Sequence, residues 1–413
     1  MKNNIEIITT GDEILSGITQ DTNFSWLSNL IFETGSKVRY KQCIGDNLED
    51  ILKALNVASL RSNIVIFTGG LGPTDDDLTR LAASKFFDKK LKLNKKSEEK
   101  IKKIFFNRKR KYSFTNKKQA MFPNESKIIV NPFGTADGFM MTKESSKFYF
   151  LPGVPKELKA MISKYVLKDI KKSIRDSKKF MSYKMIKVYG LPESEVAEKL
   201  IGINKKNTDI GYRPSNFEIH LRVLANGTSK KESDKKLNIV CDKIKKRLNE
   251  YIFSYDQEET LFQVVFDILL KKRMKISFAE SCTGGMISNE LTNISGSSKV
   301  YGFGLNTYSN SAKTKILNVS DNLLKKYGAV SREVVRVMVK NLIKLSKSDI
   351  GIAVSGIAGP SGGSKNKPVG TVFVAYYLNN KIITRKYFFT GTRKSIKLRT
   401  TLEVYDFIRK NLL

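Results

Sequence analysis

A short loop of small and hydroxyl-bearing residues, Ser281 to Gly285, separates a predicted strand from a predicted helix. The strand is the apolar run 274–278, and the helix follows from the apolar spacing over 286–294. This order aims the loop's side chains and N–H groups at one point beside a helix N-terminus, which suits an anion or a developing oxyanion. The loop therefore indicates phosphate binding or nucleophilic chemistry. An ordinary N-cap followed by glycines for close packing explains the same residues equally well.

The C-terminal part of the chain contains five loops that combine hydroxyl side chains with glycine, more than packing requires. His220 is the only histidine, which excludes a histidine-based triad or a multi-histidine metal site. A lysine desolvated in a pocket can accept a serine proton instead. Lys313 follows a small-residue turn, with Tyr308 five residues before it, although most lysines in so basic a chain must lie on the surface. The candidate hydroxyls are those of Ser281, Ser298 and Ser355.

A second motif, residues 68–79, combines glycines with three consecutive aspartates. Gly69, Gly70 and Gly72 let backbone amides approach a phosphate, as in an anion-binding nest. Aspartates beside a phosphate imply a bridging cation, and oxygen ligands favour a hard divalent ion. The alternative is an Asp-rich helix cap with unpaired surface charge. The metal–nucleotide interpretation is favoured because further carboxylates are predicted at the same edge: Asp12, Glu13 and Asp46.

The order of the predicted elements indicates how these motifs are positioned. Strands at 5–9, 37–44 and 64–67 alternate with helices and carry the polar motifs at their carboxyl ends, which predicts a parallel sheet with a ligand crevice there. Residues 171–255 form a small α+β domain without a polar constellation, a spacer or dimerisation domain. Residues 256–413 return to α/β. We therefore expect α/β domains over 1–170 and 256–413, the first with three layers.

Composition bounds the class of protein. The 413 residues are 40% hydrophobic, and no apolar run approaches the roughly 20 residues of a membrane span. The start has no signal-peptide pattern, and three scattered cysteines form no zinc spacing, so we expect a reducing cytoplasm and no membrane. The net charge of +34 is spread along the chain. Even its densest run, 89–118, favours a solvated surface over a nucleic-acid site.

The N-terminal motifs resemble the molybdopterin-binding (MoaB/MogA-like) domain of the CinA family. The resemblance covers 10–13, 21–23, 45–46, 68–79, 131–136 and 151–158. It implies a metal-dependent ADP-ribose pyrophosphatase, with Asp46 and Asp77 at a divalent metal and the diphosphate, and Asp12 near the substrate. Gly69, Gly70 and Gly72 would form the cradle. Members of the family usually carry proline where this chain has Asp137, so the role of that loop is less certain.

The C-terminal motifs resemble the CinA C-terminal domain, a PncC-type nicotinamide-nucleotide amidase. The similar segments are 279–285, 296–298, 307–313, 328–331, 355–360 and 367–372. The resemblance implies hydrolysis of the carboxamide of nicotinamide mononucleotide to nicotinate mononucleotide and ammonia, without a cofactor, in a homodimer. Ser298 would be the nucleophile and Lys313 the general base. The other implied site residues are Tyr308 for proton transfer, Ser281 and Ser355 for the amide or oxyanion, Thr283, Gly284 and Gly285 for the substrate, and Arg393 for the ribose phosphate.

Two other functions compete with a bifunctional nucleotide-salvage enzyme. A DNA-associated competence or damage-response factor fits the positive charge, but it would require clustered basic residues with interleaved aromatics or a nucleic-acid fold, which the sequence does not reveal. A molybdopterin-binding protein with a structural C-terminal domain fits the first domain alone. The Ser–Lys constellation argues against it.

Overall fold

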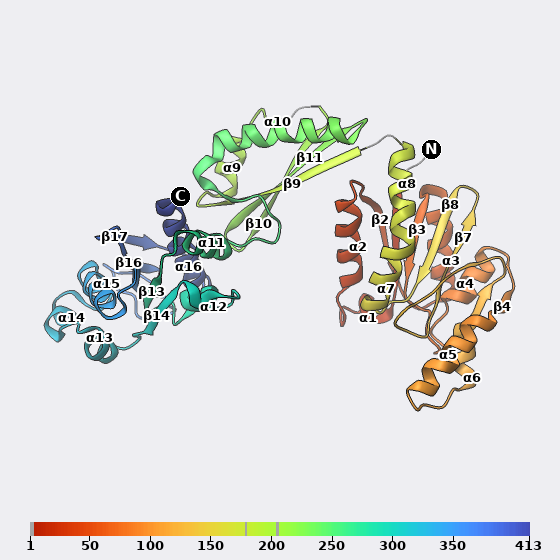
Figure 1. Cartoon of the computed structure of the whole chain (residues 1–413), viewed down its shortest axis with the longest axis horizontal. Coiled ribbons are helices and arrows are strands. Elements are labelled where there is room, and N and C mark those ends of the chain that lie inside the picture. The colour runs from red at the N-terminus through yellow and green to blue at the C-terminus, as the bar shows by residue number, and fades with distance from the viewer. Residues whose placement is uncertain (1–3, 178–179, 204–205) are drawn as a thin grey trace. The chain divides into compact units, whose positions relative to one another are not determined.

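The computed structural model describes residues 4–177, 180–203 and 206–413, and the chain divides into two compact units (Figure 1). The first unit comprises 1–182 with 225–236, and the second comprises 183–224 with 237–413. The domain boundaries expected from the sequence stay a prediction. None of the described helices is long and apolar enough to cross a membrane.

The first unit is built on a six-stranded sheet in the order β2-β1-β3-β8-β7-β6. β1, β2, β3 and β8 pair in parallel, and β7 pairs antiparallel with β6 and β8. Because helices cover both faces, the central strands β1 and β3 are buried on both sides and are rich in β-branched residues. The strands are β1 (Ile5–Thr10), β2 (Val38–Ile44), β3 (Ile64–Thr68), β6 (Lys127–Ile129), β7 (Gly138–Lys143) and β8 (Ser146–Leu151).

Two hydrophobic clusters lie on opposite faces of this sheet. Val65 and Phe67 of β3 pack with α3 and α4, whereas Ile64 and Ile66 pack with α2, α7 and α8. A two-stranded sheet of β4 (Leu91–Leu93) and β5 (Met121–Pro123) brackets the insertion that carries α5 and α6. The helices are α1 (Asp12–Leu15), α2 (Thr22–Glu33), α3 (Leu48–Arg61), α4 (Thr79–Phe86), α5 (Lys95–Asn107), α6 (Phe114–Lys117), α7 (Pro155–Met161) and α8 (Leu167–Ser177), with a 3₁₀ turn η1 (Lys118–Ala120) and a π-helical turn η2 (Ile162–Val166).

The middle of the chain forms a four-stranded sheet in the order β10-β11-β9-β12. In β11 the apolar residues Ile219, Leu221 and Val223 are buried and alternate with more exposed polar ones, as the sequence predicts. His220 lies on the polar side, 2.9 Å from Glu218. The elements are β9 (Phe180–Tyr189), α9 (Glu193–Lys199), β10 (Thr208–Ser215), β11 (Glu218–Gly227), α10 (Lys230–Leu248), the 3₁₀ turn η3 (Asn249–Tyr251) and β12 (Ile252–Ser254).

The C-terminal domain has a five-stranded sheet in the order β14-β13-β15-β16-β17. β13 lies between β14 and β15 and is parallel to both, so the carboxyl ends of these three strands meet at one edge. The strands are β13 (Ile276–Glu280), β14 (Tyr301–Asn306), β15 (Ile350–Gly356), β16 (Thr371–Leu378) and β17 (Lys381–Phe388); the helices are α11 (Leu261–Lys272), α12 (Met286–Thr292), α13 (Asn310–Leu317), α14 (Asp321–Tyr327), α15 (Arg332–Ser346) and α16 (Arg393–Leu412), with a 3₁₀ turn η4 (Ser297–Lys299).

The predicted hairpin in this domain is present. β16 and β17 pair antiparallel, and their turn residues Asn379 and Asn380 have φ of 49° and 58°. Two consecutive positive φ values are those of a type I′ turn, which asparagine tolerates and which matches the twist of the strands. The sheet separates two cores, one with α11, α12 and α16 and the other with α15. The α/β class expected for the two large domains is confirmed.

Candidate active sites

Lys313 is buried at the carboxyl edge of the C-terminal sheet. It belongs to α13, and its side chain is only 1% exposed. Its Nζ donates to Ser281 Oγ at 2.9 Å and to the backbone oxygens of Thr307 and Tyr308 at 2.8 and 3.2 Å. No carboxylate of a described residue forms an ion pair with it. Burial therefore lowers the pKa of Lys313.

The candidate serines occupy three different environments. Ser281 is buried directly after β13 and accepts the hydrogen bond of Lys313. Ser298 lies in the exposed turn η4, and no described hydrogen bond links it to Lys313. Ser355 is buried in β15 and donates to the backbone oxygen of Ala329 at 2.8 Å. The structure thus brings Ser281 and Lys313 together, whereas Ser298 as the nucleophile stays a prediction.

The loop 281–285 does not present its helix N-terminus to a ligand. The carboxylate of buried Glu280 accepts hydrogen bonds from Ile287 N at 3.1 Å and from Ser288 N at 2.8 Å. The amide of Gly284 donates to Ser281 O at 3.0 Å. The anion at the start of α12 is therefore the carboxylate of Glu280, and this contact was not predicted from the sequence.

Other features of this loop remain compatible with substrate binding. Gly284 and Gly285 have φ of 60° and 89°, a backbone that favours glycine. The Oγ1 atom of Thr283 is buried and has no hydrogen-bond partner in the described part of the chain. A buried hydroxyl of this kind calls for an explanation, and a bound substrate is one.

Arg393 contacts the predicted proton-transfer residue. Its Nη2 donates to the hydroxyl of Tyr308 at 2.5 Å, and its Nη1 donates to Gly359 O at 2.8 Å. Tyr308 is 56% exposed, so this pair lies at the open side of the buried Lys313. The two predicted residues are 85 positions apart in the sequence, and the fold brings them into contact.

A cavity of ≈ 460 Å³ lies at the carboxyl ends of the N-terminal strands. Of the predicted residues, Asp46, Asp77, Gly69, Gly70 and Gly72 line it, whereas Asp12 does not. Asp12 instead accepts a hydrogen bond from Asp46 N at 3.3 Å and donates its own amide to the Asp46 carboxylate at 3.2 Å. Asp12 therefore positions Asp46 through these hydrogen bonds without lining the cavity itself.

The two predicted metal ligands already accept hydrogen bonds from the protein, Asp77 within its own loop and Asp46 from the end of β1. Asp77 accepts from Gly72 N at 2.7 Å and from Thr74 N at 2.9 Å, and Asp46 accepts from Thr10 Oγ1 at 2.8 Å. The described residues include no group of three or more acidic, histidine or cysteine side chains arranged for a metal ion. Two carboxylates nevertheless suit a Mg²⁺-type ion, which usually takes one or two from the protein and the rest from water and substrate phosphate.

The glycines of this cavity serve backbone packing more than amide presentation. The amide of Gly69 donates to Leu151 O at 3.1 Å, and that of Gly72 donates to Asp77. A Cβ on Gly70, whose φ is 61°, would lie 2.3 Å from Thr79 Oγ1. Two of the three expected cradle amides are therefore already occupied, that of Gly69 by β8 and that of Gly72 by Asp77, the aspartate that was expected to bind metal.

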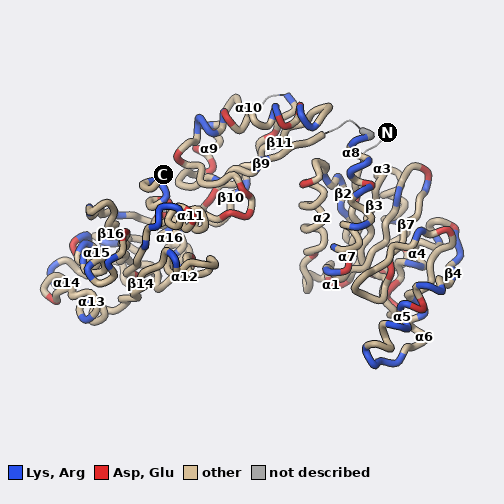
Figure 2. The backbone as a smooth tube through the Cα atoms, in the orientation of Figure 1, with Lys and Arg blue, Asp and Glu red and all other residues tan. Residues whose placement is uncertain are grey.

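The charge of the lining is unexpected. Of the described residues that line the cavity, none is lysine or arginine. Figure 2 shows basic residues throughout both parts of the chain, so their absence here is local. The acidic lining residues are Glu13, Asp21, Asp46, Asp76, Asp77 and Glu157.

Comparisons with known proteins agree on the family. Family profiles match residues 6–172 ("Probable molybdopterin binding domain"), 183–254 ("Damage-inducible protein CinA KH domain") and 258–412 ("CinA C-terminal domain"). A CinA-like protein of Dictyoglomus thermophilum is 38% identical over 410 residues, which are 99% of each chain. A CinA-like protein of Kosmotoga olearia is also 38% identical, over 99% of this chain and 98% of the relative. The chain belongs to the CinA family.

Solved structures match parts of the chain. The competence/damage inducible protein CihA of Agrobacterium tumefaciens is 36% identical, covers 36% of this chain and 90% of its own, and has a TM-score of 0.35. The protein CinA of Thermoplasma acidophilum is 34% identical, covers 41% of this chain and 98% of its own, and has a TM-score of 0.37.

The sequence analysis did not recognise the middle domain as the CinA KH domain. KH domains clamp nucleotides with a Gly-x-x-Gly loop. Residues 183–254 contain no such sequence, because their glycines stand at 190, 202, 211 and 227. The middle domain therefore matches the CinA KH domain but lacks the Gly-x-x-Gly loop that binds nucleotides in KH domains. The expectation that nucleic acid is not a partner stays a prediction.

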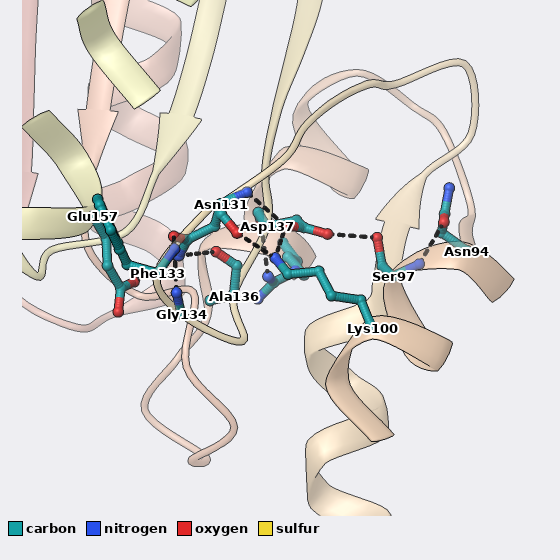
Figure 3. A network of polar contacts seen from close by, with 10 residues as sticks. Asn94, Ser97, Lys100, Asn131, Phe133, Gly134, Ala136, Asp137 and Glu157 are labelled. Carbon is teal, nitrogen blue, oxygen red and sulfur yellow. Dashed lines mark hydrogen bonds and ion pairs between the residues drawn. The ribbon is translucent and has the colours of Figure 1, made fainter. Parts of the chain in front are cut away.

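Asp137, which stands where CinA proteins usually carry proline, is the centre of a buried polar network (Figure 3). Its Oδ1 accepts from Asn131 N at 2.8 Å and from Lys100 Nζ at 2.5 Å, and its Oδ2 accepts from Ser97 Oγ at 2.8 Å. Asn131 in turn donates to Glu157, a lining residue of the cavity, at 2.7 Å. Hydrogen bonds to α5 thus fix the loop 131–137 where proline stiffness is missing.

Proposed function

We propose that the C-terminal domain hydrolyses the carboxamide of nicotinamide mononucleotide, giving nicotinate mononucleotide and ammonia. The observation that carries this proposal is Lys313, a buried lysine whose Nζ contacts a serine hydroxyl and, among the residues that the structure describes, no carboxylate. A lysine in this environment loses its proton more readily than a surface lysine and can serve as a base. Packing alone does not favour burying such a group.

The reaction follows from this pair. A serine oxygen attacks the carboxamide carbon while Lys313 takes the hydroxyl proton. The lysine then gives that proton to the departing amine, so that ammonia leaves and an acyl-serine ester remains. Water attacks the ester with Lys313 again accepting the proton, which releases the carboxylate and restores the serine. Each turnover consumes one water molecule, and no metal or cofactor takes part.

Two serines are candidates for the attack, on different grounds. Geometry supports Ser281, because its Oγ lies 2.9 Å from Lys313 Nζ. Resemblance to the amidases names Ser298, in which case Ser281 would relay the proton from Ser298 to Lys313. Both arrangements use Lys313 as the base.

Arg393 and Tyr308 lie at the open side and fit the ribose phosphate, which a guanidinium can bind with two hydrogen bonds.

Trapping the acyl-serine distinguishes the candidates. Rapid acid quench of the enzyme with nicotinamide mononucleotide, followed by trypsin, yields the peptide 276–299, which contains both serines. Fragmentation in the mass spectrometer then locates the added acyl group on Ser281 or on Ser298. A label on either serine supports the amidase and assigns the nucleophile. No label, together with no ammonia from folded protein, would refute the proposed reaction.

We further propose that the N-terminal cavity hydrolyses a nucleoside diphosphate compound such as ADP-ribose with a divalent metal ion. The acidic lining supports this, because carboxylates repel a diphosphate unless cations lie between them. Asp46 and Asp77 would hold the ion, which would supply charge neutralisation and activation of water. Calorimetric titration with ADP-ribose should show binding with Mg²⁺ and none with a chelator. Binding that is unaffected by the chelator would refute metal-dependent recognition.

A further inference from the structure

Two buried polar atoms in the wall of the N-terminal cavity have no hydrogen-bond partner among the described residues. They are Oε1 of Gln119 and Oγ1 of Thr68. Both residues line the cavity, although their side chains are 3% and 1% exposed. Leaving such atoms unpaired is costly, so each requires an explanation.

The backbone around both residues is fixed. Thr68 is the last residue of β3, and Gln119 lies in η1. Beside Gln119, Ala120 O accepts a hydrogen bond from Asn94 N at 2.9 Å, and Lys118 donates to the backbone oxygen of Thr74 in the aspartate loop. The carboxamide of Gln119 therefore belongs to a segment that is tied to the loop of Asp77.

The missing partner of Gln119 has a definite chemistry. A carbonyl oxygen only accepts hydrogen bonds, and a phosphate at neutral pH has almost no proton to donate. The carboxylates that share the lining also only accept. An O–H or N–H group of a ligand, presented beside the phosphates, would satisfy this atom. Thr68 can both donate and accept, so a hydroxyl group of the ligand would satisfy it as well.

We infer that Gln119 and Thr68 recognise the sugar of the ligand, namely the vicinal hydroxyls of a ribose joined to the diphosphate. This inference rests on the proposed function of the cavity and assigns the residues that determine its specificity for the sugar. The cavity then selects a nucleoside diphosphate sugar over pyrophosphate, because pyrophosphate leaves both atoms unpaired. Metal-bridged carboxylates hold the charged part, and the two neutral side chains hold the sugar.

Calorimetric titration in Mg²⁺ of wild type, Gln119→Met and Gln257→Met tests the inference, with ADP-ribose and pyrophosphate as ligands. Methionine keeps the size of glutamine and removes the acceptor. Gln257 is the control, because it is exposed and does not line the cavity, and its variant should bind both ligands as the wild type does. We expect Gln119→Met to bind ADP-ribose about tenfold more weakly, from the loss of one hydrogen bond, and to bind pyrophosphate as the wild type does. Unchanged pyrophosphate binding also shows that the variant is folded.

The other outcomes separate this inference from the proposed hydrolase. Equal weakening for both ligands would overturn the inference, because Gln119 would then act through the metal or the fold. Unchanged binding of ADP-ribose by Gln119→Met would overturn the inference as well. So would a wild-type protein that binds pyrophosphate but not ADP-ribose. The selective loss in a protein that binds but never cleaves ADP-ribose would support the inference and refute the hydrolase. Binding of neither ligand would overturn both.

Discussion

The ammonium nitrogen of Lys313 lies 2.9 Å from the hydroxyl oxygen of Ser281, in a pocket where the remaining partners of the lysine are two backbone oxygens. The lysine comes from α13 and the serine from the end of β13. The two residues are 32 positions apart in the sequence. They meet because β13 and β14 are parallel neighbours, which places the loops after both strands at the same edge of the sheet.

The first prediction concerns pH. The neutral amine of Lys313 is the form that accepts a proton, and burial lowers its pKa. Amidase activity should therefore rise as pH increases through this pKa, with the midpoint below that of an ordinary lysine. The kcat–pH profile of ammonia release measures this midpoint. A flat profile, or a rate that falls as pH rises through this range, would contradict a lysine base.

Replacement of Arg393 should weaken recognition of the phosphate. Loss of a charge-assisted hydrogen-bond pair predicts a KM for nicotinamide mononucleotide about 10- to 100-fold higher in Arg393→Met. Nicotinamide riboside, which lacks the phosphate, is the matched substrate and should be affected far less. Arg399→Met, on the same helix, provides the control variant. Equal losses for both substrates would mean that Arg393 acts through Tyr308 or the fold.

Asp46 and Asp77 should be required for the metal-dependent activity of the N-terminal domain. Asp46→Asn and Asp77→Asn keep the shape of the side chains and remove a charge, so each should lower ADP-ribose hydrolysis by about 100-fold or more. Asp75→Asn is the control, because Asp75 is exposed and does not line the cavity. Full activity in the two test variants would place the metal elsewhere. Ammonia release by the C-terminal domain should be unchanged in all three.

The network of Asp137 predicts a loss of stability. Asp137→Ala leaves Asn131 N and Ser97 Oγ without their acceptor and removes the carboxylate partner of Lys100 Nζ, which keeps Asn131 O. It should lower the free energy of unfolding by about 3 kcal/mol. Urea unfolding measures this value, with Glu99→Ala on the exposed side of α5 as the control. A change below about 0.5 kcal/mol, the size of an ordinary surface substitution, would show that the network contributes nothing.

The α/β class and the hairpin at 371–388 were predictable, because apolar runs, alternation and asparagine turns are local signals. The pairing of Lys313 with Ser281 was not, because their contact depends on strand order. The hydrogen bonds of Glu280 and Asp77 were not predictable either. Each carboxylate accepts from backbone amides a few residues away, and residue type alone does not reveal such contacts. Gln119 was missed because it stands in a lysine-rich segment without a recognisable motif.

The most direct test of the account is the initial rate of ammonia release from nicotinamide mononucleotide in the presence of a chelator. Wild type should release ammonia under these conditions, and Lys313→Met should be slower by about 1,000-fold, the scale of general-base catalysis. Lys315→Met, an exposed lysine two residues away on α13, should match the wild type. Wild-type protein that releases no ammonia, or a Lys313→Met variant that works normally, would contradict the account.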